Sequence, residues 1–312
     1  MTSTLTTAEP ASSSSIASTS NAPRHSSGAR TALAIGAGVS ALAFVVAVVG
    51  LASDPTLIAG SPAWMKPAKF AFSITVYLLT LRWIVSFVSG HRRLLTVIAS
   101  AIAGALIVEI ALVDLQVLRG TASHFNEATD LDALVFYAMG GIVTIVLVAT
   151  IGAGVLALRT RGLDAGLAAG LRWGIGVCVL GMLATVTMIL NKGWSDSGGH
   201  TVGAADGGPG MMITGWSLLH GDLRIGHFVG LHALQVLPLV AWALARFTNL
   251  DEQSRARLVH IVGGTYATAV ILLTWQAMRG QSLLQPDAVT LVTSAVLAVA
   301  AGTAATIVLL RR

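Results

Sequence analysis

The chain has 312 residues, of which 54% are hydrophobic and only 11% are charged, and its mean hydropathy is +0.78. This composition is typical of a multi-pass membrane protein and excludes an ordinary soluble domain. The formal net charge of +5 arises mostly from arginines beside the ends of apolar runs, so we expect no solvated basic surface for nucleic acid. The single cysteine, Cys178, excludes an intrachain disulfide, a thiolate metal cluster and dithiol redox chemistry, and we expect it in the core.

The chain begins with a segment rich in Ser, Thr and Ala, residues 1–29, which lacks apolar periodicity and is expected to be a disordered cytoplasmic tail. Eight apolar runs follow, each long enough to cross about 30 Å of hydrocarbon. They lie near residues 31–52, 68–89, 94–117, 133–158, 169–190, 225–246, 257–278 and 288–310. The first run is longer than the apolar part of a signal peptide, so we interpret it as a true span. The sequence therefore predicts an all-α integral membrane protein with eight transmembrane helices.

Positive residues predict the orientation of these spans, because Lys and Arg favour the cytoplasmic side. With the N-terminus inside, 13 of the 19 Lys and Arg residues lie on the cytoplasmic side and 6 on the other. Eight spans then bring both termini to the cytoplasm. Arg82 lies within the second run but near its inner end, where a long side chain can reach the interface. The prediction is a multi-pass protein of the bacterial cytoplasmic membrane with both termini inside.

The pattern Q-x-x-R-G closes the third run at residues 116–120 and the seventh run at residues 276–280. A second similarity supports the first, because Lys69 near the start of the second run and His227 near the start of the sixth are each followed by Phe. Since four spans is an even number, two such units point the same way in the membrane. The sequence thus predicts two parallel four-helix repeats, residues 30–160 and 161–312.

Most other polar residues lie toward the outer ends of the runs. Glu109 lies about a third of the way down the third run, where a lipid-facing carboxylate would be costly, so we expect it to face the bundle interior. Gln116 follows seven residues later on the same helix face, and Arg119 is three residues beyond. This stripe joins a buried acid to an outer cation. A purely structural hydrogen bond or ion pair is the alternative interpretation of Glu109.

The sixth run carries histidines in a similar place. His232 and Gln235 are three residues apart, about two turns into the membrane, and His227 lies about 140° around the helix from His232. A straight helix does not aim both histidines at one metal, and the H-E-x-x-H pattern is absent, so no metal site is predicted. Gly226 and Gly230 on the same run are spaced for close helix packing.

The candidate ligand- or proton-binding residues are the polar residues gathered near the outer side, namely Lys69, Glu109, Asp114, Gln116, Arg119, His124, Asn126, Asp222, Arg224, His227, His232, Gln235, Gln276 and Arg279. Four more residues of this region are expected to be merely solvated, namely Asp130, Asp132, His200 and Asp206. No nucleophile elbow, catalytic triad or phosphate-binding loop is present, so no catalytic residue is assigned.

Three functions from different classes fit this set. The first is transport or binding of a small polar or anionic solute, with Glu109 carrying a proton and His232 acting as a relay. The second is a haem- or quinone-linked membrane oxidoreductase, in which His227 or His232 would hold haem together with His124 or a methionine. The third is a metal-dependent membrane hydrolase, which needs several His and Asp residues on zinc. Solute transport or binding is the favoured function.

Three segments carry a family resemblance: Lys66-Pro67-Ala68-Lys69-Phe70, the stretch from Arg119 to Asn126, and the stretch from Asp222 to His232. They resemble motifs of a family of bacterial eight-span integral membrane proteins without an assigned activity, over nearly all of the chain after the tail. Two four-helix units also resemble haem A synthase, in topology alone. The chain departs from that family at Lys69, which stands opposite His227, and in the fourth and eighth runs, which lack histidine.

Overall fold

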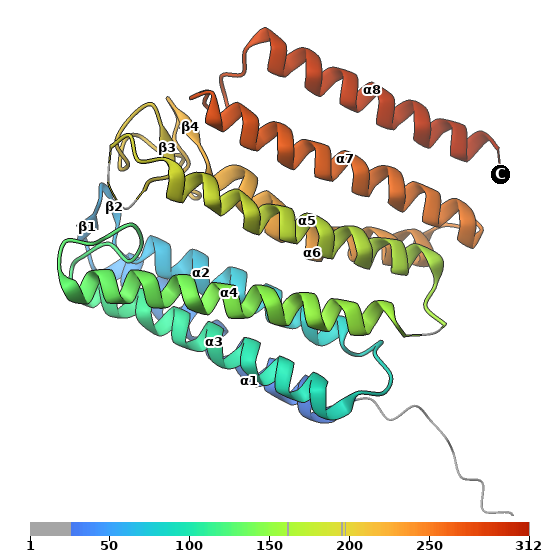
Figure 1. The fold of residues 1–312 in the computed structure, drawn as a ribbon, viewed down its shortest axis with the longest axis horizontal. Helices are drawn as coiled ribbons and strands as arrows, with labels where there is room; N and C mark the ends of the chain where they lie inside the picture. The colour runs from blue at the N-terminus through green and yellow to red at the C-terminus, as the bar shows by residue number, and fades with distance from the viewer. Residues whose placement is uncertain (1–25, 161, 195, 197, 312) are drawn as a thin grey trace, which may run out of the picture.

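The computed structural model describes residues 26–160, 162–194, 196 and 198–311. Over these residues the chain forms eight α-helices and two short antiparallel strand pairs (Figure 1). The helices are α1 (Ser27–Ser53), α2 (Met65–Ile84), α3 (Arg92–Leu118), α4 (Asp130–Leu158), α5 (Ala165–Leu190), α6 (Arg224–Phe247), α7 (Glu252–Met278) and α8 (Ala288–Leu310). The strands are β1 (Leu57–Ile58) paired with β2 (Ser61–Pro62), and β3 (Thr201–Val202) paired with β4 (Gly221–Asp222).

Short polar side chains fix where several helices begin. The N-caps of α1, α4, α5, α7 and α8 each accept a hydrogen bond from a backbone N–H of the first turn, and they are Ser26, Thr129, Asp164, Asp251 and Asp287. Residues 1–25 of the expected tail lie outside the described residues, and α1 begins within the remainder. Ser26 also donates to the carbonyl oxygen of Arg92 at 3.3 Å, which joins the start of α1 to the start of α3.

The second helix ends earlier than its apolar run predicts, at Ile84 instead of residue 89. The backbone amides of Ser86, Phe87 and Val88 bond to carbonyl oxygens three residues back, which closes tight turns instead of continuing the α-helix. Gly90, with φ +79°, then takes the left-handed conformation before α3 begins. The apolar character of this turn made it indistinguishable from helix in the sequence.

Seven of the helices, all except α2, are long and apolar enough to span a membrane. The 20 residues of α2 include Lys66, Lys69 and Arg82, which lower its apolar content. Large apolar side chains cover the outward faces, and on α8 Thr290 is the residue that is buried. Exposed apolar surface on this scale requires a lipid solvent rather than water. The chain is therefore a multi-pass membrane protein.

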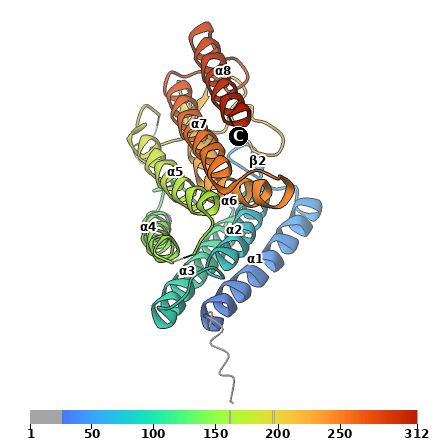
Figure 2. The ribbon, with the colours of Figure 1, turned by 90° about the vertical axis from the view of Figure 1, so that its right-hand side faces the viewer.

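The helices lie side by side along one direction, with the strand pairs and longer loops gathered at one end (Figure 1). We call this the loop end, formed by residues 54–64, 119–129, 191–194, 196 and 198–223, and we call the opposite end, where α1 and α3 begin, the basic end. Helix α1 packs against α2 and α3, and α5 packs against α6 and α7. Likewise α3 contacts α4, and α7 contacts α8. Contacts of α4 with α5 and of α2 with α6 join the two sets of helices (Figure 2).

The apolar core crosses from the first four helices to the last four. One buried cluster contains Leu78 and Ile102 together with Leu171, Cys178 and Leu234. Cys178 is thus a core residue, as expected from the sequence.

Glycines allow close helix approaches. A methyl group added at Gly181 of α5 would stand 2.7 Å from Cα of Gly230 on α6, and Gly226 faces Thr274 of α7 in the same tight manner. The G-x-x-x-G spacing therefore serves helix packing, which confirms the prediction.

Candidate functional site

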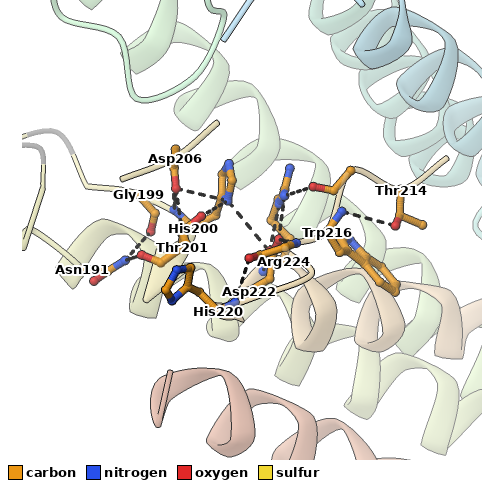
Figure 3. A network of polar contacts seen from close by, with 12 residues as sticks. Asn191, Gly199, His200, Thr201, Asp206, Thr214, Trp216, His220, Asp222 and Arg224 are labelled. Carbon is orange, nitrogen blue, oxygen red and sulfur yellow. Dashed lines mark hydrogen bonds and ion pairs between the residues drawn. The ribbon is translucent and has the colours of Figure 1, made fainter. Parts of the chain in front are cut away.

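A long loop, residues 191–223, covers the loop end between α5 and α6, and a polar network holds it in place (Figure 3). Asp222 is buried at the centre of this network. Its carboxylate accepts hydrogen bonds from the Arg224 guanidinium at 2.9 and 2.6 Å and from the backbone N–H of Ser217 at 2.9 Å. Asp206 accepts from the backbone N–H of His200 at 3.1 Å. The loop is thus ordered by carboxylates that bind its own backbone and the start of α6.

His200 lies between the two carboxylates, with Nδ1 at 3.3 Å from Asp206 Oδ1 and 3.9 Å from Asp222 Oδ1. Burial, and then the charge of Arg224, lower the pKa of His200 to about 4, although both carboxylates act in the opposite direction. His200 is therefore neutral at pH 7. Burial by itself raises the pKa of Asp222, but the hydrogen bonds and charge of Arg224 outweigh it and lower the pKa overall, so this carboxylate is ionised.

Two cations tie the loop to both sets of helices. Lys69 of α2 donates from Nζ to the carbonyl oxygen of Thr214 at 2.9 Å. Arg224 of α6 donates to the next carbonyl oxygen, that of Gly215, at 2.6 Å. Consecutive carbonyl groups thus bind one cation from the first half of the chain and one from the second. The candidate residues Lys69 and Arg224 are brought together by the loop rather than by a direct contact.

Nine residues before the end of α3, Glu109 is buried with 1% of its surface exposed. Among the described residues neither of its carboxylate oxygens has a hydrogen-bond partner. Nε2 of His124, in the loop between α3 and α4, lies 4.0 Å from Glu109 Oε1. The His124 ring packs between Phe70 and Phe136, at centroid distances of 5.6 and 6.5 Å. Burial, and then the charge of Lys66, hold the pKa of His124 well below its ordinary value, so a neutral imidazole faces the carboxyl.

Lys66, in the first turn of α2, is the cation of this site that was missing from the sequence-based candidates. Its ammonium lies 5.7 Å from the ring centroid of Phe70, and it interacts electrostatically with Glu109, Arg224 and Lys69. It forms no hydrogen bond or ion pair with any residue that the structure describes. The K-P-x-K pattern at the start of an apolar run was the available signal, but the approach of Lys66 to Glu109 depends on the packing of α2 beside α3.

Both Q-x-x-R-G segments form the same helix ending. The glycine has φ +71° in the first and +74° in the second, the left-handed conformation that ends an α-helix. The backbone carbonyl of each glutamine accepts from the amide five residues later, at 3.0 and 3.3 Å. Each glutamine side chain donates to the carbonyl six residues later, from Gln116 to Ala122 at 3.4 Å and from Gln276 to Ser282 at 2.8 Å. Both glutamines are buried and stabilise the turn that follows their helix.

The arginine of each motif binds an aspartate at the start of the next helix. Arg119 donates to Asp132 at 2.6 Å and also to the side chain of Gln116, while Arg279 pairs with Asp287. Asp132 is only 3% exposed, so its expected solvation is wrong. Its placement in the first turn of α4, facing the end of α3, explains the burial. Arg119 and Arg279 therefore join consecutive helices, and both guanidinium groups are occupied.

Other candidates lie elsewhere at the loop end. Asn126 donates to the carbonyl of Ala122 at 2.9 Å and so stabilises its own loop. His227 Nδ1 lies 2.8 Å from the carbonyl oxygen of Gly181, and because a carbonyl can only accept, Nδ1 is the donor.

The remaining candidates lie on α3 and α6. His232 is half-buried on α6, and the amide of Gln235, oriented to donate, reaches the His232 carbonyl oxygen at 3.0 Å. Asp114 is half-buried on α3. In the part of the chain that the structure describes, no group of three or more His, Cys, Asp or Glu side chains is arranged to hold a metal ion.

Comparison of the chain with protein-family models, curated proteins and solved structures finds no match. The candidate site is therefore assigned from the geometry of its residues.

Proposed function

We propose that the protein binds and transports a small polar or anionic solute at a site formed by Lys66, Glu109 and His124. The observation that carries this proposal is the buried carboxyl of Glu109, whose oxygens have no hydrogen-bond donor among the described residues. An unpaired buried polar group costs about 1–3 kcal/mol, and a charged group costs more. A solute or a proton on these oxygens would offset that cost. Ionisable groups inside a membrane protein are for this reason strong candidates for a transport pathway.

The three side chains offer complementary chemistry. Lys66 provides a cation that is not already engaged by a described acceptor, and it would attract the anionic group of a solute. Glu109 would exchange a proton, and His124, 4.0 Å away and neutral at pH 7, would accept or donate one from the side of the loop. Phe70 contacts both Lys66 and His124 and would form an apolar wall for a small solute.

We also propose how the helices are arranged in the membrane. We infer that α2 is the eighth span, because its 20 residues extend about 30 Å, the thickness of the hydrocarbon layer. The loop end would face away from the cytoplasm of a bacterial cell, because most arginines lie toward the basic end. The equivalent helix endings at Gln116 and Gln276, and the equivalent packing of α1 and α5 on their neighbours, support two parallel repeats.

Entry of a solute from the loop end would require the covering loop to move. The bond from Lys69 to Thr214 joins the loop to α2, so its rupture would free this part of the loop from α2 without unfolding a helix. Loops of this kind open on microsecond to second timescales. The Lys69–Thr214 contact is thus the expected gate.

A thermal-shift screen of the purified protein tests the proposal, using acetate, lactate, pyruvate and inorganic phosphate as probes, followed by uptake of the stabilising probe into proteoliposomes with a pH-sensitive dye inside. The wild type should take up the probe together with protons. Lys66→Gln should weaken probe binding, whereas Lys192→Gln, at an exposed lysine of the same end, should not. Uptake that is equally fast with Lys66→Gln and Glu109→Gln would contradict the proposed site.

A further inference from the structure

A second charged site lies at the basic end, far from Glu109. A shallow, open cavity of about 450 Å³ lies at the surface between α1 and α2 and is lined by Ser27, Arg30, Thr31, Ala34, Ile35 and Arg82. The five residues from α1 are spaced i, i+3, i+4, i+7 and i+8, so they form one stripe along the first two turns of that helix. Arg82 comes from the last turn of α2, which runs in the opposite direction. One arginine from each of two helices therefore lines the same cavity.

Neither guanidinium is neutralised by the residues around it. Arg30 and Arg82 form no ion pair with any residue that the structure describes, and Arg82 Nε is buried without a hydrogen-bond acceptor there. The sequences of α1 and α2 contain no Asp or Glu. The first acid on α3, Glu109, lies 17 residues after its start at Arg92, which places it about 25 Å along the helix.

The other half of the basic end has a different charge balance. There Arg255 of α7 donates to Asp164, the N-cap of α5, at 2.7 Å. In the first half, the start of α3, whose Arg92 carbonyl accepts a hydrogen bond from Ser26, contributes the arginines Arg92 and Arg93 and no acid. The second half of this end thus contains carboxylates that can pair with its arginines, whereas α1, α2 and the first turns of α3 contain none.

The lining of the cavity defines the chemistry of its ligand. Paired guanidinium groups match the oxygens of a phosphate, and the hydroxyl groups of Ser27 and Thr31 can donate to the same oxygens. The backbone amides at the start of α1 also favour an anion. Ala34 and Ile35, the latter 60% exposed, continue the stripe from the polar end toward the middle of the membrane. A ligand with a phosphate at one end and acyl chains at the other fits both parts.

We propose that the cavity between α1 and α2 is a binding site for the phosphate headgroup of an anionic phospholipid, held by Arg30 and Arg82. The lipid chains would lie along Ile35 on the outward face of α1. Basic pockets between membrane helices are suited to such headgroups, because the surrounding leaflet supplies the anion at high local concentration. This site is independent of the solute site at Glu109, and neither proposal requires the other.

Native mass spectrometry of the whole protein, released from nanodiscs of phosphatidylglycerol mixed with phosphatidylcholine, tests the site. The wild type should retain phosphatidylglycerol in preference to phosphatidylcholine and should gain thermal stability when phosphatidylglycerol is added. The double variant Arg30→Gln with Arg82→Gln should lose both effects. Arg93→Gln, at an exposed arginine of the same end that does not line the cavity, should keep both.

Three outcomes would overturn the proposal. Selective retention of phosphatidylglycerol by the folded double variant would mean that the lipid binds elsewhere. Equal loss with Arg93→Gln would mean that only the general charge of this end matters. An equal gain in stability from inorganic phosphate alone would indicate a soluble anion rather than a lipid. If the double variant fails to fold, Arg30→Gln, whose side chain is only partly buried, provides the same comparison.

Discussion

The contact between Gly181 and Gly230 makes a quantitative prediction about how α5 and α6 are held together. Replacing Gly181 with Ala would place the new methyl carbon 2.7 Å from Cα of Gly230 and 2.8 Å from the next backbone atoms. Carbon atoms in favourable contact are about 3.5–4.0 Å apart, so the helices must separate by about 1 Å. Overpacking of this kind costs about 1–3 kcal/mol. The same separation would lengthen the 2.8 Å contact between His227 and the Gly181 carbonyl.

A second glycine of α5 provides the matched control. Gly176 has no atom within 4 Å of an added methyl, so Gly176→Ala gains the helix preference of Ala over Gly, about 1 kcal/mol, without a clash. Both variants gain this term, and their difference isolates the packing cost. Unfolding by sodium dodecyl sulfate in mixed micelles, followed by circular dichroism, should therefore show Gly181→Ala to be less stable than Gly176→Ala by about 1–3 kcal/mol. Equal stability of the two variants would refute the close approach of α5 and α6.

Two further predictions concern the loop end. In the same unfolding assay Arg119→Gln should destabilise the protein clearly more than Arg279→Gln, because Asp132 is 3% exposed and would lose its cation, whereas Asp287 keeps access to solvent; equal losses would contradict this reading. His200 has a folded-state pKa of about 4 against an ordinary 6.5, so the unfolded loop binds the proton first. The folded loop is therefore destabilised as the pH falls from 6.5 toward 4. The protection factors of its amides, corrected for intrinsic exchange at each pH, should fall over that range in the wild type but not in His200→Gln.

The number and placement of the helices could be predicted from the sequence, because length and apolar content decide them. The end of the helix formed by the second run could not be predicted in this way. Val85 and Val88 continue its apolar character, but the backbone between them forms tight turns. No difference in side-chain polarity marks that change. The all-helical membrane architecture was therefore predictable, and the exact end of α2 was not.

The location of the candidate site could be predicted from the sequence, but the roles of several of its residues could not. Burial of Glu109 follows from the cost of a carboxylate in hydrocarbon, and this expectation is confirmed. The Q-x-x-R-G residues drew attention because they recur, yet their contacts are local to helix endings and to the next helix. Recurrence of a pattern indicates a shared structure as readily as a shared ligand.

The contacts of Lys66 and Asp132, by contrast, were not predicted from the sequence. Both looked like ordinary residues near a helix start, and both acquire their roles from a neighbouring helix. Asp132 meets Arg119 from α3, and Lys66 interacts with Glu109 from α3. Such contacts between helices depend on how the helices pack, and this packing is not evident from a single sequence.

Calorimetry measures directly whether Glu109 exchanges a proton when a solute binds. Titration of the purified protein with the most stabilising of the four probes, in two buffers of different ionisation enthalpy, gives the number of protons exchanged on binding. The wild type and Asp114→Asn, altered at another acid of α3, should exchange protons with the buffer. Glu109→Gln should still bind the probe, more weakly, and exchange none. The same proton exchange in Glu109→Gln as in the wild type would contradict the account.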